Sequence, residues 1–228
     1  MTFLYFIYLL LKDIGMFLNQ ELLRMTLPLP MMRYREINII KEVIANTNPE
    51  RVLEWGCGYS TLYFSKILGD GASWLSIDHN PHWMEKIERR NKNPNVSIHY
   101  VKPENPERTD EFRNGGYSDL AGYLEFPTDM GKFDLILIDG RARKECLIKA
   151  KELVAGNGIV ILHDANRVSY HEPLKEYKSQ EFFLDSRTTG YGIWLGSNER
   201  DIGSLIDVPR HQKLWKHYKT KFAAKFRI

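Results

Sequence analysis

The sequence predicts an α/β protein built on a doubly wound, mostly parallel sheet of seven strands. From about residue 34 to residue 196, apolar runs of strand length alternate with segments of helical periodicity. Glycine pairs at 56–58, 69–71 and 156–158 mark turns between these segments. The length of 228 residues, with 43% hydrophobic and 27% charged residues, indicates one soluble globular domain with a substantial core.

The expected strands are short, and the fourth is nearly all apolar, as a strand buried on both faces should be. They lie at 52–54, 74–78, 97–101, 134–139, 159–162, 182–185 and 192–195. Apolar residues three or four positions apart predict the helices. These lie at 34–46, 61–68, 81–87 and 144–153, and a last one begins at Ser169, where Ser169 and Glu172 suggest a capping box. The last two strands fit a hairpin at the sheet edge.

Residues 1–33 form an apolar extension ahead of this domain. The stretch 2–11 is almost wholly apolar, but it is too short to cross a bilayer. It has no basic flank and no small-residue cleavage site, so it is a poor signal peptide and fits a helix better. We expect this helix to pack on the core, on a second copy of the chain or on a membrane surface.

The segment 208–228 forms a basic, aromatic tail behind the domain, which then spans 34–207. It holds seven Lys or Arg and no acid, in a chain with a net charge of +3. Trp215, Tyr218, Phe222 and Phe226 interleave with the bases at spacings that suit an amphipathic helix. Such a helix can dock on the core with a solvated basic face, lie on an anionic membrane, or, as the least favoured alternative, bind nucleic acid.

The two cysteines, Cys57 and Cys146, provide neither a disulfide framework nor a metal-binding spacing. A reducing compartment fits this pattern best. We therefore expect a cytoplasmic protein, with peripheral membrane contact as an alternative.

The most informative stretch is a glycine turn that follows the first expected strand. Glu54 ends the strand, and Gly56 and Gly58 allow the backbone to pass close to a ligand. A plain tight turn is the simplest interpretation. A dinucleotide site would need a third glycine, which is Thr61 here.

Acids end four of the expected strands: Glu54, Asp78, Asp139 and Asp164. In an open parallel sheet, ligands bind outside the carboxyl ends of the strands, so these acids should line one rim. Asp78 is placed to accept hydrogen bonds from two ribose hydroxyls. For any single one, a turn-capping role is the alternative.

The pattern E-x-G-x-G at Glu54, Gly56 and Gly58 resembles motif I of the class I S-adenosylmethionine-dependent methyltransferases. The strings FDLILIDGRAR and GIVILHDANR are similar to those of small-molecule O-methyltransferases, and the resemblance covers roughly 51–196. It implies a Rossmann-like sheet with an antiparallel last strand and S-adenosyl-L-methionine as cofactor. With the acids above, the cofactor residues are expected to be Glu54, Gly56, Gly58, Ser60, Thr61, Asp78, Ser118, Asp119 and Asp139.

Some of these enzymes, of the catechol type, hold a divalent cation with two acids at these strand ends, followed directly by an Asn. Asp139 and Asp164 match the two acids, which implies Mg²⁺ or another divalent cation. The Asn lies one position late, at Asn166. The string HDANR also resembles the glucuronoxylan O-methyltransferases of plants, which modify a sugar acid hydroxyl.

Methyl transfer requires alignment of the acceptor and removal of its proton. His163 is the candidate base, because its pKa lies near neutrality, and a buried structural His is the alternative. Asp139 and Asp164 complete the expected catalytic set. Arginines near the same rim favour an anionic acceptor; they are Arg141, Arg143 and Arg167. The long connection 103–132 is expected to be a mobile cover that brings Ser118 and Asp119 near the adenine.

Together these features predict methyl transfer from S-adenosyl-L-methionine to an oxygen of a small-molecule or glycan-linked acceptor. The alternatives are a nicotinamide-dependent oxidoreductase and a non-catalytic, membrane-peripheral protein that keeps the fold. A homo-oligomer is compatible with the apolar N-terminus.

Overall fold

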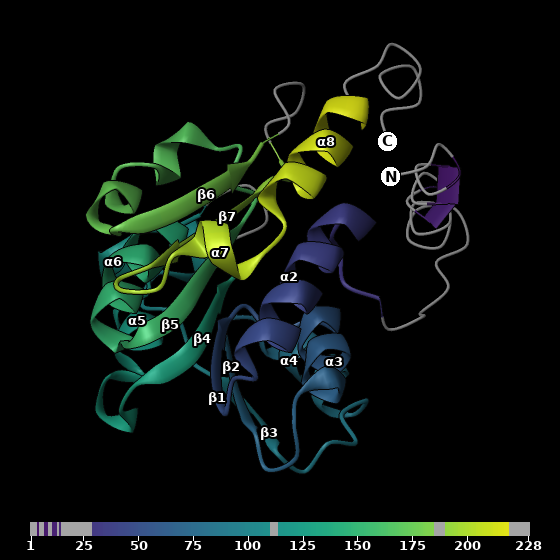
Figure 1. Ribbon diagram of the computed structural model, residues 1–228. Helices are drawn as coiled ribbons and strands as arrows, with labels where there is room; N and C mark the ends of the chain where they lie inside the picture. Colours follow the sequence, from purple (N-terminus) through teal and green to yellow (C-terminus); the bar gives the residue numbers. More distant parts are fainter. Residues whose placement is uncertain are drawn as a thin grey trace.

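A seven-stranded sheet forms the centre of the protein, with helices on both faces (Figure 1). The computed structural model describes residues 29–109, 114–184 and 190–218, and six residues between Leu4 and Ile14. The strands are β1 Arg51–Trp55, β2 Ser73–Asp78, β3 Val96–Tyr100, β4 Phe133–Ile138, β5 Val154–His163, β6 Ser179–Phe183 and β7 Ile193–Ser197. The helices are α2 Tyr34–Thr47, α3 Tyr59–Phe64, α4 Pro81–Glu88, α5 Ala121–Glu125, α6 Arg143–Leu153, α7 Ile202–Leu205 and α8 Val208–Tyr218.

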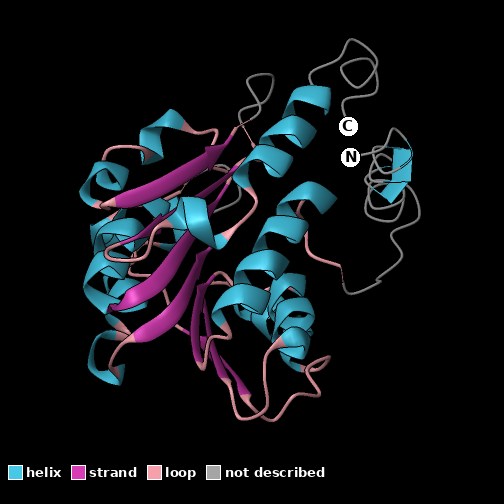
Figure 2. Ribbon diagram, in the orientation of Figure 1, coloured by secondary structure: helices cyan, strands magenta, loops and turns pink. Residues whose placement is uncertain are grey.

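The strand order is β3-β2-β1-β4-β5-β7-β6. The first five strands pair in parallel, and β7 runs antiparallel to both of its neighbours. The predicted fold class is therefore confirmed, with its antiparallel last strand (Figure 2). The chain turns back between β1 and β4, and a ligand crevice is expected at such a switch point.

Side chains alternate between the two faces of the sheet and so divide the core into two clusters. On β4, Ile136 and Ile138 face the cluster that includes residues of α6, whereas Leu135 and Leu137 face the cluster that includes residues of α2. All four are at most 1% exposed. The apolar run of β4 thus reflects burial on both sides.

The prediction of a helix that begins at Ser169 is wrong. Two single turns of 3-10 helix, Val168–Tyr170 and Pro173–Glu176, occupy this segment. Pro173 has no amide hydrogen and cannot continue a helix from the preceding turn. The segment instead buries Tyr170 and Leu174 against the sheet.

Strand β5 begins five residues earlier than expected and runs through Gly156 and Gly158. A Cβ on Gly158 would lie 2.9 Å from the Phe133 carbonyl oxygen and 3.0 Å from that of Asp134. The glycine that suggested a turn therefore allows close strand pairing at a register shift.

The described part of the basic tail packs on the protein. Helix α8 buries Leu214 and Trp215, and the Arg35 guanidinium lies 4.5 Å from the Trp215 ring. Phe222 and Phe226 lie outside the described residues, as does most of the apolar extension. The six described positions between Leu4 and Ile14 are helical. Within the described part of the chain, no helix has the length and apolarity needed to cross a membrane.

Candidate active site

A cavity of about 530 Å³ opens at the carboxyl ends of β1, β2, β4 and β5. Of the residues predicted from the sequence, those that line it are Gly56, Gly58, Ser60, Asp78, Asp139, His163 and Asp164. Four others do not line it: Glu54, Thr61, Ser118 and Asp119. Three of the four strand-end acids therefore line one cavity, as expected. The fourth, Glu54 of the glycine motif, does not line it.

The glycine turn brings two loops into contact. Gly56 has φ +100, and a Cβ there would lie 2.5 Å from the Gly140 backbone, in the turn after β4. Only glycine meets both demands without strain. Gly58 precedes α3, and its amide donates to the Thr61 hydroxyl at 2.9 Å. This cap starts the helix at Tyr59, two residues earlier than expected.

Glu54 holds the turn from below rather than facing the cavity. It is fully buried, and four groups donate to its carboxylate. They are the hydroxyls of Ser60, Thr61 and Ser76 and the indole of Trp74, at 2.5, 2.5, 2.8 and 3.0 Å. The expectation that Glu54 contacts the cofactor does not fit this geometry, because its carboxylate is enclosed by these donors.

Burial raises the pKa of Glu54 from 4.5 to about 7, against the effect of its four donors. The unfolded chain ionises first, so the contribution of Glu54 to the free energy of unfolding is greatest below pH 4.5 and is lost as pH rises through about 7. We expect a loss of up to about 3 kcal/mol, measured by urea unfolding across this range.

Glu54→Gln should abolish this loss. Its amide oxygen can replace the carboxylate oxygen that accepts three hydrogen bonds, and its NH₂ can donate to the Ser60 hydroxyl. An equally steep pH dependence in the variant would contradict the assignment.

Asp78 lines the cavity at the end of β2 and is 4% exposed. Its Oδ1 accepts the Asn80 amide at 2.8 Å, which fixes the carboxylate at the start of α4. Tyr59 and Trp83 form an aromatic wall beside it, with ring centroids 5.9 Å apart. The sequence analysis did not assign these two rings, although Trp83 follows the Asn80 cap at helical spacing.

Ser118 and Asp119 do not contribute to the cavity wall. Asp119 is buried and accepts the Gly116 amide and the Asn105 side chain, both at 3.0 Å. Ser118 is exposed. The described part of the connection 103–132 contains three 3-10 turns and α5, and it contributes Thr109 to the cavity wall.

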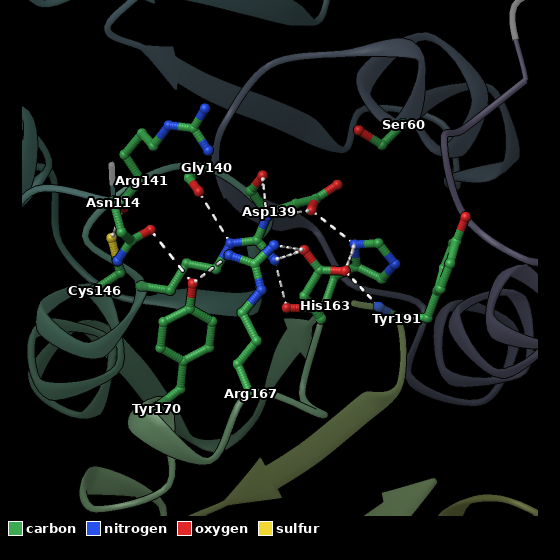
Figure 3. A network of polar contacts seen from close by, with 12 residues as sticks. Ser60, Asn114, Asp139, Gly140, Arg141, Cys146, His163, Arg167, Tyr170 and Tyr191 are labelled. Carbon is green, nitrogen blue, oxygen red and sulfur yellow. Dashed lines mark hydrogen bonds and ion pairs between the residues drawn. The ribbon is translucent and has the colours of Figure 1, made fainter. Parts of the chain in front are cut away.

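Arg143 occupies the place between the two acids expected to hold a metal. It is buried, with Nη2 3.1 Å from Asp139 Oδ1 and Nη1 3.2 Å from Asp164 Oδ2 (Figure 3). Despite burial, His163 and Arg143 lower the pKa of Asp164 to about 2. No cluster of metal-ligating side chains occurs among the described residues. The donor set therefore does not fit a cation, since the Arg143 guanidinium and the His163 ring already pair with these two carboxylates.

His163 lies between two carboxylates. Its Nδ1 is 2.8 Å from Asp139 Oδ1, and its Nε2 is 3.4 Å from Glu36 Oε2. Burial lowers the pKa of His163, but Asp139 and Glu36 outweigh this and raise it well above its usual value. The predicted general base is therefore a protonated ring with both nitrogens directed at acids, which argues against that role.

Glu36 is the site residue that sequence reasoning missed. It is fully buried in the first turn of α2, where it accepts the amides of Arg33 and Gly192, each at 2.7 Å. No local pattern could reveal it, because Glu36 and His163 are far apart in the chain and meet only in the fold.

We expect Glu36→Gln to lower the pKa of His163, because the neutral amide no longer favours the imidazolium. A raised folded-state pKa stabilises the fold below the unfolded pKa, and this stability is lost as pH rises through the folded value. Titration of the His163 Cε1–H NMR signal would measure the shift. The exposed His82 on α4 is the internal control, and identical His163 titrations would contradict the prediction.

Comparison with known proteins places this site in a family. A family model described as a methyltransferase domain matches residues 53–165, which include the glycine turn and all four strand-end acids. A stretch of 47 residues is 40% identical to catechol O-methyltransferase B of Danio rerio and spans 20% of this chain and 18% of that protein.

Solved structures share the fold over most of the chain. A putative caffeoyl-CoA O-methyltransferase from Staphylococcus aureus aligns with a TM-score of 0.57 at 17% identity, over 85% of this chain and 100% of that one. An O-methyltransferase from Bacillus cereus, solved in complex with SAH, aligns with a TM-score of 0.53 at 14% identity. The alignment covers 83% of this chain and 88% of that one. The match to the methyltransferase-domain model overturns the nicotinamide alternative, and the chain belongs to the class I S-adenosylmethionine-dependent methyltransferases.

Proposed function

We propose that this enzyme transfers a methyl group to an oxygen of a small-molecule or glycan-linked acceptor. The observation that carries the proposal is the cavity at the switch point, which combines a glycine turn and a ribose-type acid with a partly exposed carboxylate, that of Asp139, after the end of β4. The matched relatives are named as O-methyltransferases. The likeness of HDANR to glycan-modifying enzymes supports the glycan-linked alternative.

The residues proposed to hold S-adenosyl-L-methionine are those of the cavity wall near β1 and β2. Asp78 would bind the ribose, and the Gly56–Gly58 turn and Ser60 would accommodate the methionine end. Glu54 and Thr61 support this turn from beneath. When bound, the cofactor supplies an activated methyl group on a sulfonium.

Asp139 is the proposed proton acceptor. Among the described residues, His163 and Arg143 contact its Oδ1 and none contacts its Oδ2, while the side chain lines the cavity with 20% exposure. A carboxylate held in this way can take a proton from an acceptor hydroxyl through its other oxygen. His163, Arg143 and Glu36 then act as positioning residues for Asp139, and Asp164 as the second anchor of Arg143.

Isothermal titration with S-adenosylmethionine, SAH and NADH tests the proposal, in the presence and absence of Mg²⁺. We expect micromolar binding of the first two ligands, no binding of NADH, and no effect of Mg²⁺. With a panel of hydroxylated acceptors, SAH release should require Asp139 and fall by roughly 100-fold or more in Asp139→Asn. Failure of both methionine ligands to bind would reject the function.

A further inference from the structure

Arg141 is a cavity residue whose guanidinium has no polar partner among the described residues. It lies in the turn after β4 and lines the cavity. Its Nε is inaccessible to solvent and, among the described residues, makes no hydrogen bond. Figure 3 shows its side chain extending away from the Arg143 network, with no polar contact to the residues drawn there.

The other two arginines of the rim are engaged. Arg143 pairs with Asp139 and Asp164 and also donates to the Gly140 and His163 carbonyl oxygens at 2.9 and 2.5 Å. Arg167 lies 3.4 Å from Asp164 and donates to the Tyr170 hydroxyl at 3.2 Å. Both arginines already have protein partners, so their guanidinium groups are less available to a ligand than that of Arg141.

Arg141 is therefore the rim cation that has no acidic partner among the described residues. The other cations are paired: Arg143 lies against Asp139 and Asp164, and His163 lies against Glu36. The remaining cavity acid, Asp78, lies beside His79 at 3.4 Å. Burial and then the nearby Arg143 lower the pKa of Arg141. A partly desolvated cation beside another cation is unfavourable unless an anion joins it.

We propose that Arg141 binds an oxyanion of the methyl acceptor, a carboxylate or a phosphate, and so restricts the enzyme to acidic acceptors. This inference rests on the proposed function. The guanidinium offers a planar fork that matches two oxygens of such a group. The wall of the same cavity also holds an aromatic ring, that of Tyr191, whose amide donates to Asp164 Oδ1 at 2.7 Å.

Tyr191 and Asp164 both have left-handed backbones, with φ of 64 and 59. Non-glycine residues rarely adopt this conformation, and such strain tends to persist at ligand sites. An aromatic ring held in this way, in the cavity that the Arg141 side chain also lines, suits an acceptor with a flat body and an acidic group.

Calorimetry on the full chain saturated with SAH tests the subsite. The probes are benzoate, phenyl phosphate and the neutral benzamide, which has the shape of benzoate without its charge. We expect at least one anion to bind about tenfold or more tighter than benzamide, the effect of one charge-assisted contact. The tighter of the two anions identifies the source of the oxyanion.

Arg141→Met should abolish this discrimination and leave SAH affinity unchanged, whereas Arg141→Lys should keep part of it. Arg89→Met, an exposed arginine on α4, is the matched control. The proposal would be overturned if the anions and benzamide bound with equal affinity, or if none of the three probes bound. So would loss of SAH affinity in Arg141→Met, because the arginine would then serve the cofactor carboxylate. Failure of SAH to bind the unaltered chain would instead reject the proposed function itself.

Discussion

Asp78→Asn should weaken SAH binding by about 100-fold, the cost of losing two hydrogen bonds to a charged acceptor. Asp78 is nearly buried, lines the cavity, and is fixed by the Asn80 amide at 2.8 Å. Asparagine has almost the same size and can still accept that amide. Its NH₂ group, however, donates where ribose hydroxyls need an acceptor.

Calorimetric titration of the variant with SAH measures this loss. Asp129→Asn is the matched control, since Asp129 is exposed in a 3-10 turn away from the cavity. Equal melting temperatures of the two variants would show that the fold is retained. Unchanged SAH affinity in Asp78→Asn would contradict the ribose role.

Arg143→Met should destabilise the protein by about 3–5 kcal/mol, the cost of leaving a buried charge without its partner. The change leaves two carboxylates without their shared cation, Asp139 and Asp164. It also removes the donor to the Gly140 and His163 carbonyl oxygens. Methionine has a similar length and apolar stem, so the loss reports polar contacts more than volume.

Urea unfolding of Arg143→Met at neutral pH measures this effect. Arg141→Met provides the comparison two residues away, because Arg141 has no polar partner to lose and should cost little stability. Equal destabilisation by both substitutions would show that the Arg143 network does not hold the rim together. A free energy of unfolding that Arg143→Met leaves unchanged would lead to the same conclusion.

Much of the site could be predicted from local patterns. Glu54, Asp78, Asp139 and Asp164 follow apolar runs, and the geometry of parallel strands brings such positions to one edge. The same reasoning failed for Ser118 and Asp119, because nothing in a long polar connection tells which side chains turn inward. It failed for the segment after Ser169 because a capping pattern does not reveal that Pro173 interrupts a helix.

The sequence by itself determined the fold class, the strand ends and the glycine turn, since these depend on periodicity and backbone freedom along a few residues. Only the tertiary structure decided the roles of the charged groups. Arg143 lies where the metal was expected, Asp139 and Glu36 favour the protonated His163, and Arg141 has no polar partner among the described residues. Charge state depends on burial and on neighbours distant in sequence, so it follows from three-dimensional contact and not from residue type.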